Sequence, residues 1–212
     1  MKVTRIVKKD SRNVVVYFDN NETLILLLDV FVKSGLKKNE DISNDRFSLL
    51  IKENRLFHIK QRGLRYLGRR LHSTSELRTK LKQKGYEMEL VDNVLNELSN
   101  AGYLNDLDFA KEFTKEKFRS KLWGKNKIKS ELIKKGIAAE IITQVLSQSI
   151  NEDDEYEKAM VIAQKKIKSL IPKLDDSILL KRKVISFLNA RGYSYEIAGK
   201  VYEEIIGEED YT

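Results

Sequence analysis

A glycine-centred pattern that recurs along the chain constrains the fold more than any other feature of the sequence. The flanking residues match when the chain is aligned on Gly85, Gly136 and Gly192. Apolar residues stand eight and four positions before each glycine and five and nine positions after it, with a cation directly before it and a glutamate four positions after it. The positions eight and four before the glycines hold Leu77, Ile128, Val184, Leu81, Leu132 and Leu188. Three matching copies predict a tandem repeat.

Each shared position has a physical role in a pair of helices. The spacing of the apolar residues gives one buried stripe on each helix. Glycine ends the first helix because the capping residue adopts a left-handed conformation. The cation and the glutamate complement the dipoles of the helix that ends and the helix that begins. A further helix precedes each pair, over about 58–71, 106–122 and 155–170, so each unit is a three-helix repeat.

The pattern before residue 55 is different and indicates β structure. Two β-branched and aromatic runs, 14–18 and 23–28, flank the turn residues 19–22, and 3–7 supplies a third strand. From Asn44 the apolar spacing becomes helical and continues to about Leu71, with an interruption expected near Gly63 or Gly68.

These patterns together predict a mainly α fold in which tandem three-helix repeats form an elongated curved array. A small antiparallel β meander lies at its N-terminus. The predicted domains are 1–55 (β meander plus helix), 56–104 (first repeat), 105–150 (second repeat) and 151–212 (third repeat). The third repeat opens with the acidic run 152–155, as expected of a terminal repeat whose outer side meets water.

The positive charge of the chain is concentrated in its first two repeats. The chain has a formal net charge of +8, and residues 55–135 hold 20 of the 40 Lys and Arg but only 10 of the 32 Asp and Glu. A localised basic field favours an anionic partner such as nucleic acid or an acidic protein surface. A solvated lysine-rich surface is the simpler alternative.

Within the second repeat, cations recur at fours along one helix and continue across the joint at Trp123 and Gly124. This row is suited to a phosphate backbone or an acidic groove. Helix solubility, with Trp123 packed in the joint, is the alternative. The candidate contact residues for such an anionic partner are Lys111, Lys115, Lys117, Arg119, Lys121, Trp123, Lys125, Lys127, Lys129 and Lys134.

Residue patterns for catalysis are absent from the sequence. There is no cysteine, no phosphate-binding glycine loop and no dinucleotide fingerprint. His58 and His72 lack acidic partners at metal-ligand spacing, so we expect them to be surface or packing residues. Asp106 and Asp108 are expected to cap a helix. We therefore expect no enzyme activity, no catalytic residues, no metal and no cofactor.

No stretch is apolar for long enough to span a bilayer, and the N-terminus lacks the apolar core of a secretory signal. We expect a cytoplasmic protein with no membrane partner.

The second repeat resembles a motif of the RecX family, which regulates the bacterial RecA recombinase. That motif reads approximately Gly-Tyr-Leu-Asp-Asp-x-x-Phe-Ala, then a basic helix, a glycine, an isoleucine and Leu-x-x-Lys-Gly-Ile. The sequence departs from it at Asn105, which replaces the first aspartate. The matching residues are Gly102, Tyr103, Leu104, Asp106, Phe109, Ala110, Gly124, Ile128, Leu132, Lys135, Gly136 and Ile137.

The resemblance implies a non-enzymatic protein that binds the RecA filament on single-stranded DNA. Such a protein is expected to lie in the filament groove and to limit assembly, ATP hydrolysis and strand exchange, as a monomer that contacts DNA through the filament. The alternative is a DNA-binding module whose three-helix units resemble helix-turn-helix domains and act directly on nucleic acid. The sequence leaves open inhibition or stimulation, affinity, footprint, oligomeric state and binding to DNA alone.

Overall fold

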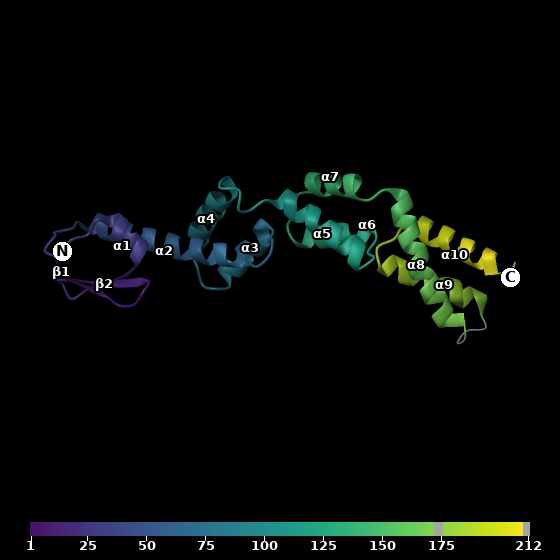
Figure 1. Cartoon of the computed structure of the whole chain (residues 1–212), viewed down its shortest axis with the longest axis horizontal. Helices are drawn as coiled ribbons and strands as arrows, with labels where there is room; N and C mark the ends of the chain where they lie inside the picture. Colours follow the sequence, from purple (N-terminus) through teal and green to yellow (C-terminus); the bar gives the residue numbers. More distant parts are fainter. Residues whose placement is uncertain (172–175, 210–212) are drawn as a thin grey trace. The chain divides into compact units, whose positions relative to one another are not determined.

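The computed structural model describes residues 1–171 and 176–209 and divides into two compact units, Met1–Leu104 and Asn105–Thr212 (Figure 1). The first unit contains β1 (Val3–Lys8), β2 (Asn13–Phe18), β3 (Thr23–Leu27), α1 (Leu28–Ser34), α2 (Asn44–Leu67), α3 (Thr74–Lys82) and α4 (Met88–Asn100). The second contains α5 (Asp106–Ser120), α6 (Lys125–Lys134), α7 (Ala139–Ser149), α8 (Glu152–Leu170), α9 (Ser177–Ala190) and α10 (Tyr195–Glu209). The predicted mainly α fold with an N-terminal sheet is confirmed.

The three strands form an antiparallel sheet in the order β1-β2-β3. In β2, Val14, Val16 and Phe18 are buried while their neighbours are half-buried, which is the alternation expected of a sheet covered on one face. The cover comes from α1 and α2, and the ring of Phe47 on α2 meets Phe18 edge-on at 5.2 Å. The predicted meander is therefore confirmed, except that Leu28 begins α1 and does not extend β3.

Helix α2 connects the sheet to the first three-helix group. It is continuous through Gly63, where an added Cβ would lie 3.0 Å from the Leu98 side chain of α4. Of the two positions at which an interruption was expected, Gly63 is wrong because this glycine permits close helix packing, and Gly68 is confirmed because α2 ends at Leu67. Near the middle of α2, buried Asn54 accepts a hydrogen bond from Leu27 N at 2.8 Å and donates one to Ile25 O at 2.9 Å, so its amide pairs with the open edge of β3. The proposed 55/56 domain boundary lies inside this helix.

The repeat glycines have the predicted conformation. Gly85, Gly136 and Gly192 have φ values of 80°, 73° and 94°, so each terminates its helix in the left-handed region. The six apolar residues eight and four positions before them are all fully buried. The glutamates four positions after them lie in the first turns of α4, α7 and α10.

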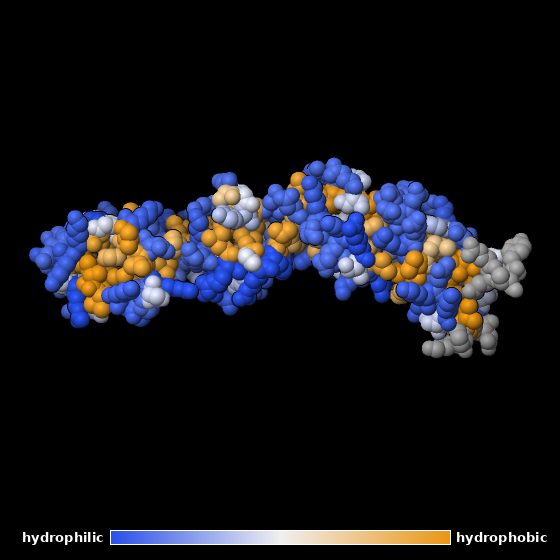
Figure 2. All heavy atoms as spheres, in the orientation of Figure 1, coloured by the Kyte–Doolittle hydropathy of each residue, from blue (hydrophilic) through white to orange (hydrophobic). Residues whose placement is uncertain are grey.

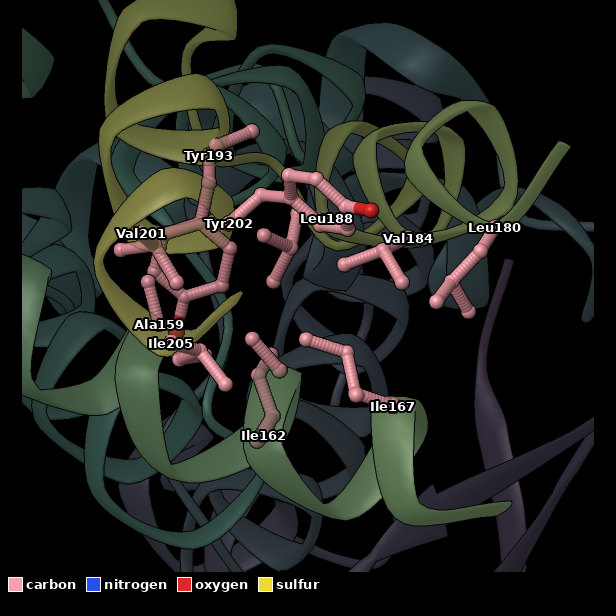
Figure 3. Packing of buried hydrophobic residues seen from close by; sticks show 12 residues of the cluster. Ala159, Ile162, Ile167, Leu180, Val184, Leu188, Tyr193, Val201, Tyr202 and Ile205 are labelled. Atoms are coloured by element: carbon pink, nitrogen blue, oxygen red, sulfur yellow. The ribbon is translucent and has the colours of Figure 1, made fainter. Parts of the chain in front are cut away.

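Each three-helix group has its own apolar core, and in Figure 1 the helices of each group lie together. Figure 3 shows the third core, where α8, α9 and α10 direct Ile162, Val184 and Val201 toward a common centre. Hydrophobic atoms reach the visible surface in separate patches along the chain (Figure 2). The last three residues of the predicted third repeat and residues 172–175 lie outside the described part of the chain.

Helix capping differs from the expectation at α5. The cap is Asn105, whose side chain accepts hydrogen bonds from Leu107 N at 2.9 Å and Asp108 N at 3.3 Å. Asp106 and Asp108 occupy the first turn, where a carboxylate stabilises the positive end of the helix dipole. At α3, Ser73 caps the helix as predicted, by accepting from Glu76 N at 3.0 Å.

Candidate nucleic-acid interface

The exposed side of α5 carries a row of three cations. Lys111, Lys115 and Arg119 follow one another at intervals of four residues and are all exposed. Phe109 and Ala110 on the other side of the helix are buried in the second core. None of the three cations has a hydrogen bond or ion pair with any residue that the structure describes, so they are available to an anionic partner.

A row of carboxylates runs beside these cations. Asp108, Glu112 and Glu116 also recur at fours and are exposed. Each precedes one cation of the first row by three residues, a spacing at which helix side chains are neighbours. The positive surface on α5 is therefore a single row of cations. The net positive charge of the segment had suggested a broader basic surface.

Trp123 lies in the joint between α5 and α6 and is half-buried against the second core. The ammonium groups of Lys117 and Lys127 lie 5.8 and 4.8 Å from the centre of its ring. Lys117 also lies 5.2 Å from the Phe113 ring and pairs with Glu116 at 2.7 Å. Trp123, Lys117 and Lys127 therefore form a packed cation–aromatic cluster that stabilises the joint.

Lys125 and Lys127 connect the second helical group to the third. Lys125 N donates to Glu155 Oε1 at 2.7 Å, and Lys125 Nζ lies 3.7 Å from Glu155 Oε2. Lys127 Nζ donates to Ala190 O at 3.2 Å. These two lysines belong to an internal interface, in contrast to the freely exposed cations of α5.

Glu155 itself corrects an expectation. The acidic run 152–155 was expected to face water, but Glu155 is only 3% exposed because α6 begins directly against it. Burial raises the pKa of Glu155, while the hydrogen bond from Lys125 N opposes this shift. Its oxygen satisfies a backbone donor at the N-terminus of α6, where the helix dipole also favours a carboxylate. No local sequence pattern indicates this contact.

The remaining candidates differ in their availability. Lys121 and Lys129 are exposed, and no described residue bonds to their ammonium groups. Lys134 pairs with Glu131 at 2.8 Å on the same helix. The candidates thus divide into five available cations, which are Lys111, Lys115, Arg119, Lys121 and Lys129, and five engaged side chains, which are Lys117, Trp123, Lys125, Lys127 and Lys134.

A second row of cations, on α2, was not among the candidate residues. Arg62 and Arg65 continue from His58 at spacings of four and three residues, and Arg69 follows just after the helix ends at Leu67. This spacing is visible in the sequence, but the helix that carries it was expected to contain a break. His58 is exposed and His72 is buried, which agrees with their predicted surface and packing roles.

No group of residues suited to a metal ion occurs within the described ranges 1–171 and 176–209. Within the same ranges, none of the helices combines the length and apolar character needed to cross a bilayer.

Comparison with known proteins identifies all three helical groups. Family models match residues 60–98 as the first three-helix domain of RecX, 105–146 as the second and 152–201 as the third. A regulatory protein RecX from Clostridium acetobutylicum is 32% identical over 95% of this chain and 94% of its own length. The RecX of Clostridium botulinum strain Eklund 17B is 29% identical over 99% of both chains.

Two solved structures share the fold. A crystal structure of regulatory protein RecX matches with a TM-score of 0.77 at 20% identity, over 95% of this chain and 98% of its own. RecX from Lactobacillus salivarius matches with a TM-score of 0.64 at 22% identity, over 72% of this chain and 97% of its own.

Proposed function

The chain belongs to the RecX family of regulatory proteins, and from that premise we propose that it regulates the RecA recombinase. In this proposal it binds the RecA filament on single-stranded DNA in the filament groove. It thereby inhibits the recombinase by limiting filament assembly, ATP hydrolysis and strand exchange. The observation that carries the proposal is the match of all three helical groups to the family's three domains in sequence order.

The five available cations of α5 and α6 are the proposed contacts with the filament. Lys111 and Arg119 are separated by eight residues of helix, a rise of about 12 Å. Over that length a cation row can approach successive phosphates and release their counterions, which makes binding favourable and dependent on salt. The adjacent carboxylate row favours a partner that offers protein surface beside nucleic acid, as a nucleoprotein filament does.

The joint between α5 and α6 supports this function by keeping the two cation-bearing helices in one arrangement. Trp123 packs under two ammonium groups, and Lys125 is bonded to Glu155 of α8. A surface that is ordered before binding loses less conformational entropy on association. The engaged residues thus contribute to binding by positioning the available ones.

The proposed action is occupancy of a groove, without a chemical step, a metal or a cofactor. A single copy with the domain organisation 1–55, 56–104, 105–150 and 151–212 is sufficient for it.

The proposal is tested by measuring RecA ATPase activity on single-stranded DNA with increasing amounts of this protein. Charge reversal of four available cations should raise the concentration needed for half-inhibition by at least about tenfold, because four phosphate or carboxylate contacts become repulsive. The test variant carries glutamate in place of Lys111, Lys115, Arg119 and Lys129. A matched control carries glutamate in place of Lys165, Lys168, Arg182 and Lys183, which are exposed on α8 and α9.

Equal inhibition by the test variant and the wild type would contradict the assignment of these cations as filament contacts. If the wild-type protein had no effect on the RecA ATPase, the proposed function would be wrong. The alternative, a helix-turn-helix-like module acting directly on nucleic acid, predicts that excess free single-stranded DNA relieves inhibition. If the protein instead binds the filament, the concentration needed for half-inhibition should rise in proportion to the concentration of recombinase.

A further inference from the structure

The outer side of α2 carries a row of basic side chains separate from those of α5 and α6. His58, Arg62 and Arg65 are spaced by four and three residues, so they lie on one side of the helix, and Arg69 follows in the turn just after the helix ends at Leu67. From His58 to Arg65 the row rises about 10 Å along the helix axis. The side that packs against α4 is marked by buried Gly63, which meets Leu98, so the cation row faces away from the core of the first three-helix group.

A groove runs between this row and the sheet of the same unit, with a volume of about 820 Å³. Arg62 and Arg65 line it from α2, and Arg12 and Asn13 line it from the end of the β1–β2 turn. Leu28 N donates to Arg12 O at 2.7 Å, which fixes this turn beside the start of α1. The Asn54 side chain bonds α2 to β3, so both walls are held together by hydrogen bonds and the groove is preformed.

The guanidinium groups of this groove are largely uncommitted. Arg12, Arg65 and Arg69 are exposed, and their side chains form no ion pair or hydrogen bond within the described part of the chain. The Arg62 guanidinium lies 5.8 Å from the centre of the Tyr86 ring, which orients it without neutralising it. Asp29 is the sole carboxylate among the described residues that line the groove.

We propose that this groove, formed by Arg12, Arg62, Arg65 and the adjoining Arg69, binds the phosphodiester backbone of a nucleic acid. The step of three residues from Arg62 to Arg65 advances about 4.5 Å along the helix, and Arg69 adds a further guanidinium group just beyond the helix end, so these groups address a repeating anion. The planar fork of arginine donates two parallel hydrogen bonds to a phosphate. His58 and Gln61 add polar groups along the same groove, which suit phosphate and sugar oxygens, whereas the Asn13 amide is hydrogen-bonded to the Asp10 carboxylate.

This contact does not require the recombinase, and it gives the first unit an affinity for nucleic acid of its own. A nucleic acid is favoured over an acidic protein because the donors form a one-dimensional array of arginines rather than an isolated cluster. Single-stranded and duplex nucleic acid present the same phosphodiester group at different spacing, and the experiment distinguishes them.

The test measures fluorescence anisotropy of labelled single-stranded and duplex oligonucleotides with the full chain, without recombinase, across a range of salt concentrations. The background is the variant that carries glutamate at positions 111, 115, 119 and 129, which removes the α5–α6 contacts. The groove variant adds Arg62→Gln, Arg65→Gln and Arg69→Gln. The matched control adds Arg78→Gln, Lys82→Gln and Lys84→Gln, which remove three charges from α3 and the residues after it.

The groove variant should bind single-stranded DNA roughly 100-fold more weakly than its background at about 0.1 M salt, and its log–log salt slope should be smaller by about 2. The control should change affinity by no more than a few-fold. Lysine in place of Arg62, Arg65 and Arg69 should retain the salt slope and lose part of the affinity, because the charge remains and the fork does not. Preference between the two oligonucleotides identifies which form of backbone the groove accepts.

Equal losses in the groove variant and the control, or no DNA binding by the background protein, would overturn the proposal. Competition by polyglutamate as strong as competition by an oligonucleotide of equal charge would assign the groove to acidic protein instead. Because recombinase is absent from this experiment, a negative result contradicts the groove proposal without bearing on the ATPase test of the proposed function. Conversely, a variant that loses only ATPase inhibition does not contradict the groove proposal.

Discussion

Gly124 and Gly192 meet through their backbones, although 67 residues separate them in the sequence. A Cβ placed on Gly124 would lie 2.5 Å from the Gly192 carbonyl oxygen, and one placed on Gly192 would lie 2.4 Å from Lys127 N. At this contact Gly124 N donates to Arg191 O at 2.9 Å and Asn126 N donates to Gly192 O at 3.0 Å. The start of α6 therefore packs directly against the turn between α9 and α10. Only glycine permits this backbone approach, because a Cβ at either position would overlap the facing chain.

Replacement of Gly192 by alanine should destabilise the second unit by about 2 to 5 kcal/mol, since it combines a left-handed conformation with overlap against Lys127. Gly85→Ala is the matched control, because Gly85 has φ +80° but nothing within 4 Å of the added Cβ. It should cost only about 1 to 2 kcal/mol. Denaturant unfolding measures both, and the fluorescence of Trp123, the one tryptophan of the chain, reports on the second unit. Equal costs would show that the close contact is not maintained in solution.

The contribution of Glu155 to stability should depend on pH. Because burial raises the pKa of Glu155 in the folded chain, folding favours the protonated carboxyl in the window between its ordinary pKa of 4.5 and the raised value. Stability from this group therefore falls as pH rises through that window. Glutamine cannot ionise, so the stability of Glu155→Gln relative to wild type should improve as pH rises from 4 to 7.5. A difference that stays constant across this range would contradict the assigned shift.

Removal of the Glu155 side chain should have a different effect from neutralising it. Glu155→Ala leaves Lys125 N without its acceptor at the start of α6, and an unsatisfied buried donor costs about 1 to 3 kcal/mol. The loss should persist at every pH at which the chain is folded. Thermal unfolding of the alanine and glutamine variants at a single pH makes the comparison.

Charge reversal should distinguish the engaged lysines from the available ones. Lys125→Glu brings a second carboxylate toward buried Glu155 and should destabilise the second unit by about 2 kcal/mol or more. Lys129→Glu, on the exposed side of α6, should change stability by less than about 0.5 kcal/mol. The urea unfolding midpoints of the two variants measure these changes. Comparable shifts would mean that the Lys125 side chain is no more engaged than that of Lys129.

Asn105→Ala should weaken the start of α5 by about 1 kcal/mol, because the asparagine oxygen caps two backbone donors. Asp108→Ala removes only a favourable charge–dipole interaction and should cost about 0.3 to 1 kcal/mol at low salt. The second effect should decrease with added salt and the first should not. Unfolding measured at two salt concentrations tests this difference.

The sequence alone determined the helical repeat. The glycine stops and the buried apolar stripes depend on residues within one or two helical turns of each other, so their periodicity is readable without coordinates. The same locality explains the errors: the local penalty for Gly63 in a helix was visible, whereas the Leu98 side chain that packs against it lies on another helix. Asp106 and Asp108 were assigned as caps because their side chains favour that role, although Asn105 holds the position.

The tertiary structure decided which charges are free. The sequence alone does not distinguish Lys111 from Lys125, since both are lysines in a basic segment. In the structure Lys111 faces solvent, whereas Lys125 is bonded to Glu155, 30 residues further along the chain. The groove beside Arg62 and Arg65 likewise depends on the sheet residue Asn13 and the turn residue Arg12 lying alongside α2. Periodicity reports the side of a helix that is buried, because burial follows the helical turn. It carries no information about which distant backbone meets that helix, since this is set by the packing of separate elements.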